Sequence, residues 1–223
     1  EVVNIDVMVN GNTLPVRYRV KIASIDEERE FYVKEMDPIR LFGLEAYSRL
    51  VEVGEDYNFL FNGDHIVENA LEGRSIVDME AGELAALTEN RRYVFTRIEL
   101  DVLQYTIGLT DIFVGQDLDP TGRNYLIASD GRIKVIDFDG MTSLKEEQFE
   151  VEERKDGTAM ELGITRETYD EMYGVIEENV IANFHRNKDH LYKLLDILGD
   201  SGGDMFEELY ANNVRRRLDQ ISG

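Results

Sequence analysis

The order of the predicted elements constrains the fold most, because strand signals fill the first part of the chain and helix signals fill most of the rest. "VVNIDVMV" and "TLPVRYRVKIA" flank "NGN", and "EFYVKEM" follows a second polar turn. Asn-Gly between two alternating apolar segments is a strong hairpin signal. We therefore predict an antiparallel three-stranded meander within about the first forty residues.

Helix signals begin directly after this meander. "PIRLFGLEAYSRLVEV" starts with Pro38 and carries apolar residues at helical spacing. "NFLFNG" and "HIVENALEG" predict two more short strands, and a long, mostly helical stretch follows them. An acidic, irregular segment is expected up to about Asp156. Three helices are predicted to close the chain: one from about Thr165, one in "DHLYKLLDILG" that stops at Gly199, and one in "DMFEELYANNVRRRLDQI".

This order predicts an α+β fold of two lobes. Residues 1–75 would form a strand-rich lobe with a small antiparallel sheet, and residues 76–223 a larger, mainly helical lobe. A chain of 223 residues is long enough to bury a sizeable core in such a fold. A parallel sheet with "KVIDF" at its centre would contradict this prediction.

Composition excludes several classes of function. Acidic residues outnumber basic ones 46 to 24, so the formal net charge of −22 disfavours binding to nucleic acid or to an anionic membrane. The absence of cysteine excludes disulfides, thiolate catalysis and cysteine zinc sites. No apolar run of about 18 residues and no signal peptide is visible. We expect a cytoplasmic location, or delivery into a host cell if the protein is an effector.

One segment carries a pattern that indicates chemistry. In "NYLIASDGRIKVIDFDG", two strand-like segments are joined by "SDG", a hairpin signal. Asn124 begins the first strand and Asp137 ends the second, 13 residues later. A tight hairpin brings these two ends together, so an amide oxygen and a carboxylate can share one cation. Such hard oxygen ligands suit Mg²⁺.

The arrangement resembles the protein kinase-like superfamily, in which H-R-D-L-x-x-x-N is followed by a hairpin and D-F-G. Here "QDLDPTGRN" corresponds to the catalytic loop and "DFDG" to the metal motif, and the resemblance is specific over residues 117–140. It implies a two-lobed kinase-like fold, ATP and Mg²⁺ as cofactors, and Asn124 and Asp137 as metal ligands. It also implies that the chain is a small, atypical member of the superfamily, similar to minimal bacterial effector kinases or small-molecule phosphotransferases. The phosphate acceptor would be a hydroxyl of a protein or a small molecule.

The resemblance extends more diffusely to the N-terminal part. "FYVKEM" is similar to the third-strand V-A-I-K, which implies that Lys34 holds the nucleotide phosphates and that Glu45 is its ion-pair partner. "HIVENALEGRSIVDM" looks like the hinge, where backbone groups of Glu68 to Leu71, Ala70 among them, would hold the adenine. Gly11 in "NGN" would cover the phosphates, because no G-x-G-x-x-G is present.

Two aspartates are candidates for the catalytic base. The "DL-P" match aligns Asp117 with the catalytic aspartate of the kinase motif. Counting five residues back from Asn124, the metal ligand, gives Asp119 instead. We favour Asp119, because loop geometry fixes the spacing from base to metal ligand. The sequence also departs from the kinase pattern, since no His precedes the catalytic aspartate and Asp139 stands inside the D-F-G triplet.

Two alternatives remain open at this level. "KVIDFDGMTSL" resembles the D-x-D-G-T motif of haloacid dehalogenase-type phosphatases, whose fold needs several parallel strands. That resemblance implies that Asp137 is the nucleophile and Asp139 the acid/base. It also implies that Lys188 or Lys193 is the phosphate lysine and that Asp200 and Asp204 form the late metal motif. The other alternative is a catalytically inactive kinase-like binding module. The missing glycine-rich loop favours such a module, while the retained Lys34, Asn124 and Asp137 oppose it.

Overall fold

The chain forms two compact units. A computed structural model describes residues 2–8, 16–22, 27–35, 38–51, 59–62, 65–69, 71–108, 125–136, 151–200 and 205–222. The first unit comprises Glu1–Asp37 and Val53–Glu72, and the second comprises Pro38–Glu52 and Gly73–Gly223. The larger segment of the second unit begins at Gly73, close to the predicted lobe boundary at residues 75 and 76. The second unit also takes in the helix that lies in the sequence between two strands of the first unit.

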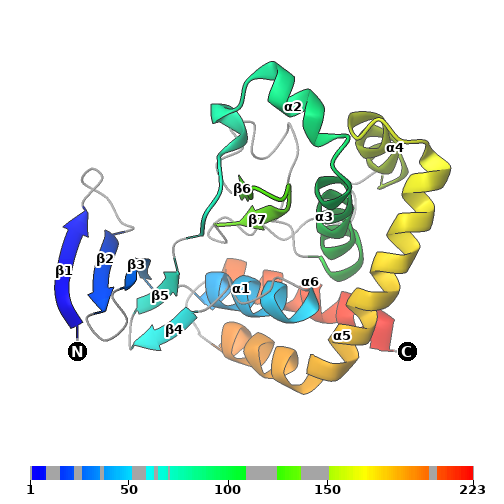
Figure 1. The fold of residues 1–223 in the computed structure, drawn as a ribbon. Helices are drawn as coiled ribbons and strands as arrows, with labels where there is room; N and C mark the ends of the chain where they lie inside the picture. Colours follow the sequence, from blue (N-terminus) through cyan, green and yellow to red (C-terminus); the bar gives the residue numbers. More distant parts are fainter. Residues whose placement is uncertain are drawn as a thin grey trace. The chain divides into compact units, whose positions relative to one another are not determined.

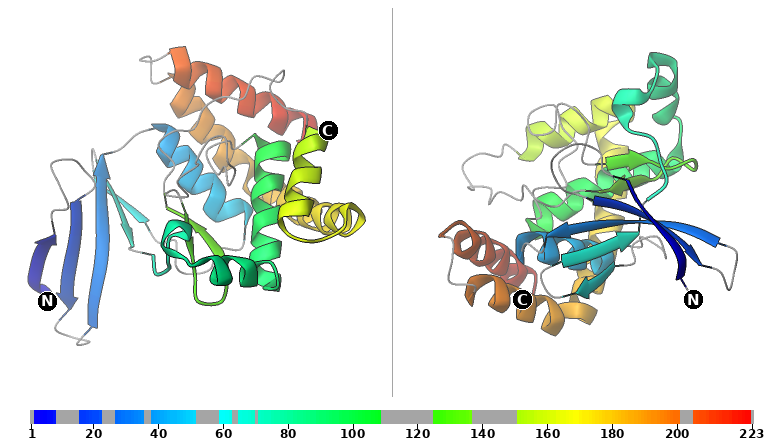
Figure 2. Two further views of the ribbon diagram at one scale, coloured as in Figure 1. Left: turned by 90° about the horizontal axis from the view of Figure 1, so that it is seen from above. Right: turned by 90° about the vertical axis from the view of Figure 1, so that its left-hand side faces the viewer.

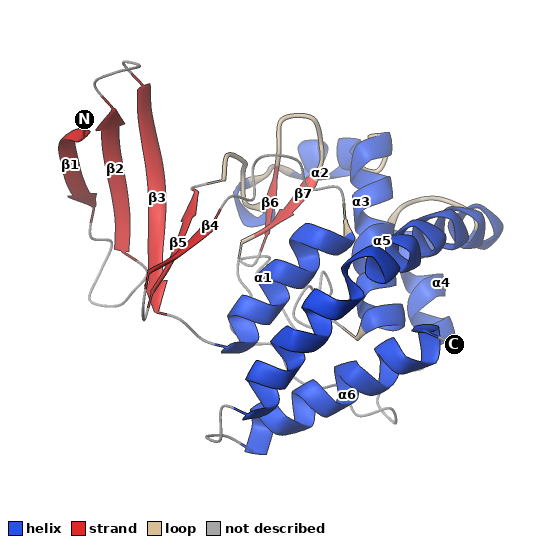
Figure 3. Ribbon diagram, turned by 90° about the horizontal axis from the view of Figure 1, so that it is seen from below, coloured by secondary structure: helices blue, strands red, loops and turns tan. Residues whose placement is uncertain are grey.

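The first unit is a five-stranded antiparallel sheet in the order β1-β2-β3-β5-β4 (Figure 3). Its strands are β1 (Val2–Met8), β2 (Val16–Ile22), β3 (Glu27–Glu35), β4 (Phe59–Asn62) and β5 (His65–Asn69). The predicted meander and the two later short strands are therefore confirmed.

Residues of opposite charge occupy directly paired positions on β2 and β3. Arg19 pairs with Glu30, and Lys21 pairs with Glu28. Cross-strand pairs of opposite charge favour one register over its neighbours, because a one-residue slip moves every side chain to the other face of the sheet. β3 pairs with β2 along one edge and with β5 along the other, so it is an interior strand of the sheet.

The second unit is mainly helical (Figure 1). Its helices are α1 (Pro38–Leu50), the 3-10 turn η2 (Ile76–Asp78), α2 (Ala81–Leu87), α3 (Arg91–Val102), the π-helical turn η3 (Leu103–Ile107), α4 (Val151–Glu161), α5 (Arg166–Asp200) and α6 (Met205–Ser222). A hairpin of β6 (Tyr125–Ile127) and β7 (Ile133–Val135) completes it. The α+β class is confirmed, and every strand pairing in the described part of the chain is antiparallel.

The core of this unit is built around α5, which packs against α1, α3, α4 and α6 (Figure 2). Its buried residues recur every third, fourth or seventh position, as one face of a helix requires. They are Tyr169, Tyr173, Ile176, Val180, Phe184, Leu191 and Leu195. Burying a large apolar side chain contributes about 1.5–3 kcal/mol, so this face is the main reason for the helix–helix packing.

Two helix predictions were wrong. The segments predicted as separate helices from Thr165 and in "DHLYKLLDILG" form the single helix α5. The stretch between them contains no Pro or Gly to end the helix, and buried residues continue on the same face beyond it. The segment predicted to be irregular up to Asp156 already belongs to α4 from Val151 onward. Only Thr158 and Ala159 of α4 are buried, so its sequence has almost no apolar periodicity to reveal it.

None of the helices in the described part of the chain combines the length and the apolar character needed to cross a membrane.

Candidate functional site

The hairpin β6–β7, which lies in the sequence between the two predicted metal-ligand positions, belongs to the described residues. Tyr125 pairs with Val135 and Ile127 with Ile133, so the strands run antiparallel from the start of β6 to the end of β7. Gly131 closes the turn with a φ of 90°, a left-handed conformation that favours glycine. Its N–H donates to the Ala128 carbonyl at 2.9 Å, as expected for a type I turn followed by a glycine bulge. The hairpin predicted from "SDG" is confirmed.

Helix α3 holds this hairpin from one side. The side-chain amide of Asn90 donates to the carbonyl oxygen of Asp130 at 3.1 Å, and Arg92 Nη1 lies 3.1 Å from Asp130 Oδ2. Further along the helix, the Ile133 N–H donates to Thr96 Oγ1 at 3.1 Å. The hairpin is therefore attached to the first two turns of α3 by its turn and by its second strand.

A backbone segment holds the hairpin on its other edge. The N–H of Arg74 donates to the Ile127 carbonyl at 2.9 Å, and the Ile127 N–H donates back to the Arg74 carbonyl at 2.8 Å. Gly73 allows this approach, because a Cβ there would lie 2.7 Å from Leu126 Cβ. The Arg74 guanidinium also pairs with Glu83 at 2.6 Å, and this hydrogen bond lowers the pKa of that carboxyl. Gly73 and Arg74, which lie within the predicted hinge segment, thus add a third backbone segment to the hairpin.

A buried ion pair lies inside α3. Arg97 Nη1 lies 2.5 Å from Asp101 Oδ1, and the two side chains are only 5% and 3% exposed. The Tyr169 hydroxyl of α5 donates to the other Asp101 oxygen at 2.8 Å. Burial and the Asp101 carboxylate together raise the pKa of Tyr169 far above its usual range. Burial lowers the pKa of Arg97, but Asp101 and Glu161 outweigh that effect and the pKa is raised. The guanidinium of Arg97 therefore stays charged.

The π-helical turn η3 is bonded to both α5 and α6. Thr106 Oγ1 donates to Glu177 Oε1 at 2.7 Å and lies 3.0 Å from the Tyr173 hydroxyl. Arg217 of α6 donates from Nη1 to the Tyr105 carbonyl at 2.5 Å. Gly108 ends the turn with a φ of 85°, and a Cβ there would lie 2.7 Å from Arg217 Cδ. Isolated π turns occur frequently at functional sites. This one directly precedes the chain segment that contains the predicted catalytic loop.

Sequence reasoning missed the residues that hold the hairpin and the π turn. Asn90, Thr96 and Thr106 are common residue types without a motif. Arg97 and Asp101 carried one signal, because opposite charges at i and i+4 stand among apolar residues in "RIELDVL". Burial, which only the tertiary structure shows, separates this pair from an ordinary surface pair.

Most of the predicted site residues lie outside the described residues. These are Gly11, Ala70, Asp117, Asp119, Asn124 and Asp137. Lys34 and Glu68 are described by their backbone: Lys34 lies on β3 paired with Ile66, and Glu68 lies on β5 between its partners on β3 and β4. Within the described part of the chain, no cluster of three or more histidine, aspartate or glutamate side chains is arranged to hold a metal ion.

Glu45 is the one predicted site residue whose side chain is described. It lies on α1 and is buried. Its Oε2 lies 2.6 Å from Arg49 Nε and 3.0 Å from His190 Nε2 of α5. The carboxylate thus links α1 to α5. The predicted pairing of Glu45 with Lys34 stays a prediction.

Comparison of the sequence with models of known protein families and with curated proteins found no match.

Proposed function

We propose that the chain is an ATP- and magnesium-dependent phosphotransferase that moves the γ-phosphate to a hydroxyl group, with a protein hydroxyl as the first acceptor to test. One observation carries the proposal. The hairpin predicted between the two metal-ligand positions forms with antiparallel register and is held by hydrogen bonds on two sides. This is the local structure that the kinase-like resemblance requires.

The register supports a shared metal. Asn124 directly precedes Tyr125, and Asp137 is the second residue after Val135. Tyr125 and Val135 are paired, so the two predicted metal-ligand positions adjoin in the sequence the residues that form one end of the hairpin. An amide oxygen and a carboxylate are suitable ligands for Mg²⁺. Asn124 and Asp137 would hold the ion, which would supply positive charge to offset the negative charge of the phosphates during transfer.

The remaining roles follow the resemblance. In protein kinases the phosphate-binding lysine lies on the third strand, and Lys34 lies on β3, an interior strand. Lys34 would hold the nucleotide phosphates. Backbone groups around Glu68 and Ala70 would hold the adenine, and Gly11 would lie over the phosphates. Asp119, or Asp117 in the other register, would orient the acceptor hydroxyl and accept its proton.

The phosphatase alternative lacks support. Its fold needs several parallel strands around the motif strand, but β7 pairs antiparallel with β6 in a two-stranded sheet. The two phosphatase motifs are separated in the sequence by a long segment, and residues 151–200 of that segment are helical apart from a short turn. Lys188 and Lys193 both lie on α5. An inactive kinase-like module differs from the proposed enzyme only in turnover, so a transfer assay separates the two.

Nucleotide binding is the first test. ATP with Mg²⁺ should raise the melting temperature more than ATP with EDTA, because a ligand that binds only the folded state stabilises it. Asp137→Ala should remove most of the magnesium-dependent part of this shift. An equal shift in the variant would mean that Asp137 is not a metal ligand. Absence of any shift in the unchanged protein would contradict the proposed function.

Transfer is the second test. With labelled ATP, Mg²⁺ and a cell lysate, Asp119→Ala should abolish transfer while ATP still binds, because the base acts on the acceptor and not on the nucleotide. Asp117→Ala should lower transfer less. The reverse order would move the base to Asp117. Normal transfer by both variants would contradict the kinase-like mechanism, and binding without transfer in the unchanged protein would favour the inactive module.

A further inference from the structure

Helix α4 is attached to the rest of the helical unit by little apolar surface. Of its eleven residues only Thr158 and Ala159 are buried, and Met160 is 81% exposed. Leu162, which directly follows the helix, is buried as well. These buried side chains all lie in the C-terminal half of α4 or just after it, so complete burial is confined to one end of the helix.

The same end of α4 is fixed by its cap. The Gly163 N–H donates to the Met160 carbonyl at 3.1 Å, and the Ile164 N–H donates to the Ala159 carbonyl at 3.0 Å. Gly163 has a φ of 66°, the left-handed conformation that ends many helices in this way. Together with the buried Leu162, the cap gives α4 a firm attachment at its C-terminal end.

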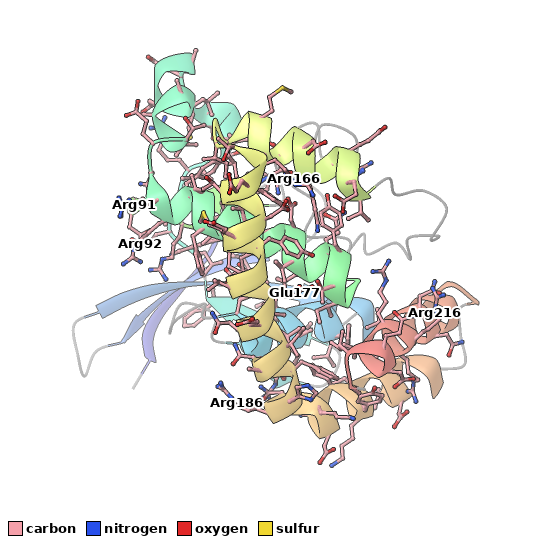
Figure 4. All side chains as sticks on the ribbon, turned by 90° about the vertical axis from the view of Figure 1, so that its right-hand side faces the viewer. Arg91, Arg92, Arg166, Glu177, Arg186 and Arg216 are labelled. Carbon is pink, nitrogen blue, oxygen red and sulfur yellow. The ribbon has the colours of Figure 1, made fainter. Side chains whose placement is uncertain are left out.

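The N-terminal half of α4 is bound by an arginine of α5, Arg166 (Figure 4). Arg166 Nη2 lies 2.5 Å from Glu152 Oε2, and Arg166 Nη1 lies 2.6 Å from Asp156 Oδ1. Nη1 also donates to the backbone carbonyl of Glu152 at 3.2 Å. The Glu152 and Asp156 side chains are 74% and 65% exposed, so dissolved salt screens both ion pairs.

A lysine in this half of α4 covers an aromatic ring of α5. Lys155 Nζ lies 4.1 Å from the centre of the Tyr173 ring, and only 16% of the Lys155 side chain is exposed. A cation in this position is attracted by the face of the ring. Movement of α4 away from α5 would therefore expose both side chains.

The helical conformation of α4 depends on its contacts with α5. Isolated helices shorter than about 12–15 residues are marginal in water, and α4 has eleven residues. Gly157 weakens the helix further, because glycine in a helix interior favours the unfolded chain. Loss of the Arg166 contacts should therefore release the N-terminal half of α4 and unfold it in the same step.

We propose that α4 is a salt-sensitive strap on α5. It opens from its N-terminal end while the rest of the helical unit stays folded, and Leu162 and Gly163 remain as its attachment. Such local opening is characteristic of segments with few buried apolar contacts. Salt favours the open state because it screens the exposed Arg166 pairs. Opening uncovers Lys155 and Tyr173, so the strap controls access to this part of α5. The inference goes beyond the proposed function and does not depend on it.

Hydrogen exchange of the full chain tests the strap without any substitution. Raising NaCl from about 0.1 M to about 1 M shortens the screening length from about 10 Å to about 3 Å. Exchange at the amides of residues 155–161 should become about fivefold faster, as expected when exposed ion pairs are lost. The amides of Ile176 and Val180 on the buried face of α5 should exchange at an unchanged rate.

Three variants at low salt test the same equilibrium. Arg166→Gln should make exchange at residues 155–161 about tenfold faster, because it removes the charge that binds both carboxylates. Gly157→Ala should make it about fivefold slower, because alanine favours the helix and the added Cβ has no atom within 4 Å beyond the neighbouring backbone of α4. Arg215→Gln is the matched control. Arg215 Nη2 lies 2.5 Å from Asp196 Oδ1 in an exposed pair between α6 and α5, and its loss should leave α4 exchange unchanged.

Three results would overturn the proposal. If α4 and the buried face of α5 exchange at the same rate at both salt concentrations, α4 opens only with the whole unit. If salt or Arg166→Gln accelerates α4 and α5 equally, the effect is a general loss of stability. If neither salt nor Arg166→Gln changes α4 exchange, Arg166 does not hold the strap. Should Arg166→Gln fail to fold, the salt dependence and Gly157→Ala decide the question.

Discussion

Arg97 and Arg166 each pair with an aspartate one helical turn later, yet the two pairs differ in burial. The Arg97–Asp101 side chains are 5% and 3% exposed, whereas those of Arg166 and Asp170 are 29% and 49% exposed. Arg166, near the start of α5 (Figure 4), also binds Glu152 of α4 at 2.5 Å. The same residue pair at the same spacing therefore tests what burial does to an ion pair.

We expect Asp101→Ala to lower the free energy of unfolding by about 3–5 kcal/mol, because it leaves a buried guanidinium without its carboxylate. Asp170→Ala should lower it by less than about 1 kcal/mol, because exposed pairs are screened by solvent. Urea denaturation of both variants measures the difference. Equal losses would mean that water reaches the Arg97 pair in solution.

Substitution of glycine by alanine should have opposite effects on stability at two positions. Gly131→Ala should destabilise the protein by about 1–3 kcal/mol, because the residue has a φ of 90° and a Cβ there would overlap the Asn90 amide. Gly174→Ala on α5 should stabilise it by up to about 1 kcal/mol, since no atom beyond the neighbouring backbone of its own helix lies within 4 Å of the added Cβ and alanine favours a helix. Thermal unfolding compares the two. Stabilisation by Gly131→Ala would contradict the turn geometry.

At the scale of elements, the hairpin and α3 form one structural module. Among the described residues no strand pairs with this edge of β7, and the Ile133 N–H donates to Thr96 Oγ1 of α3 instead. The Thr96 hydroxyl in turn lies 2.9 Å from the Arg92 carbonyl, one turn earlier in the helix. One buried side chain therefore connects the helix to the strand.

Thr96→Val should cost about 1–3 kcal/mol, because valine has nearly the same shape but leaves the buried Ile133 N–H without an acceptor. Thr88→Val is the matched control. Its hydroxyl donates to the Ala85 carbonyl at 2.9 Å in an exposed position, so its loss should change stability by no more than about 0.5 kcal/mol. Chemical denaturation checks both, and an equal effect at the two sites would refute the anchoring role of Thr96.

At the scale of the whole molecule, five described tyrosines of the helical unit have raised pKa values, and removal from water is the largest cause for each: Tyr93, Tyr105, Tyr169, Tyr173 and Tyr192. Burial raises the pKa of Tyr93 to about 12, whereas the unfolded chain titrates near 10. A raised pKa contributes stability that is complete below the unfolded value and is lost as the pH rises through the folded value. Stability should therefore fall between about pH 10 and pH 12.

Tyr93→Phe should make this fall less steep, by up to about 1.4 kcal/mol per pH unit, since one titrating group is removed. Denaturant unfolding at several pH values between about 9 and 12 measures the slope. An identical slope in the variant would show that Tyr93 ionises freely in the folded protein.

Local sequence determined the secondary structure of most described elements. Asn-Gly and Asp-Gly turns between alternating apolar residues are sufficient to predict the meander and the β6–β7 hairpin, because turn conformation and strand alternation are properties of neighbouring residues. Pro38 starts α1 as predicted, for the same reason. The order of these elements also determined the α+β class. In the candidate site, the hairpin between the metal-ligand positions was predictable, because its turn residues are adjacent in the chain.

Tertiary structure decided the features that depend on distant residues. α1 is flanked in sequence by strands β3 and β4, but it packs against α5 and belongs to the helical unit. The start of α4 depends on tertiary contacts such as Arg166 with Glu152, which no local pattern encodes. Asn90 reaches Asp130 across 40 positions of sequence, and Tyr169 reaches Asp101 across 68. Hydrogen bonds between such distant residues form only when the chain has folded, because burial and proximity are properties of the packed molecule.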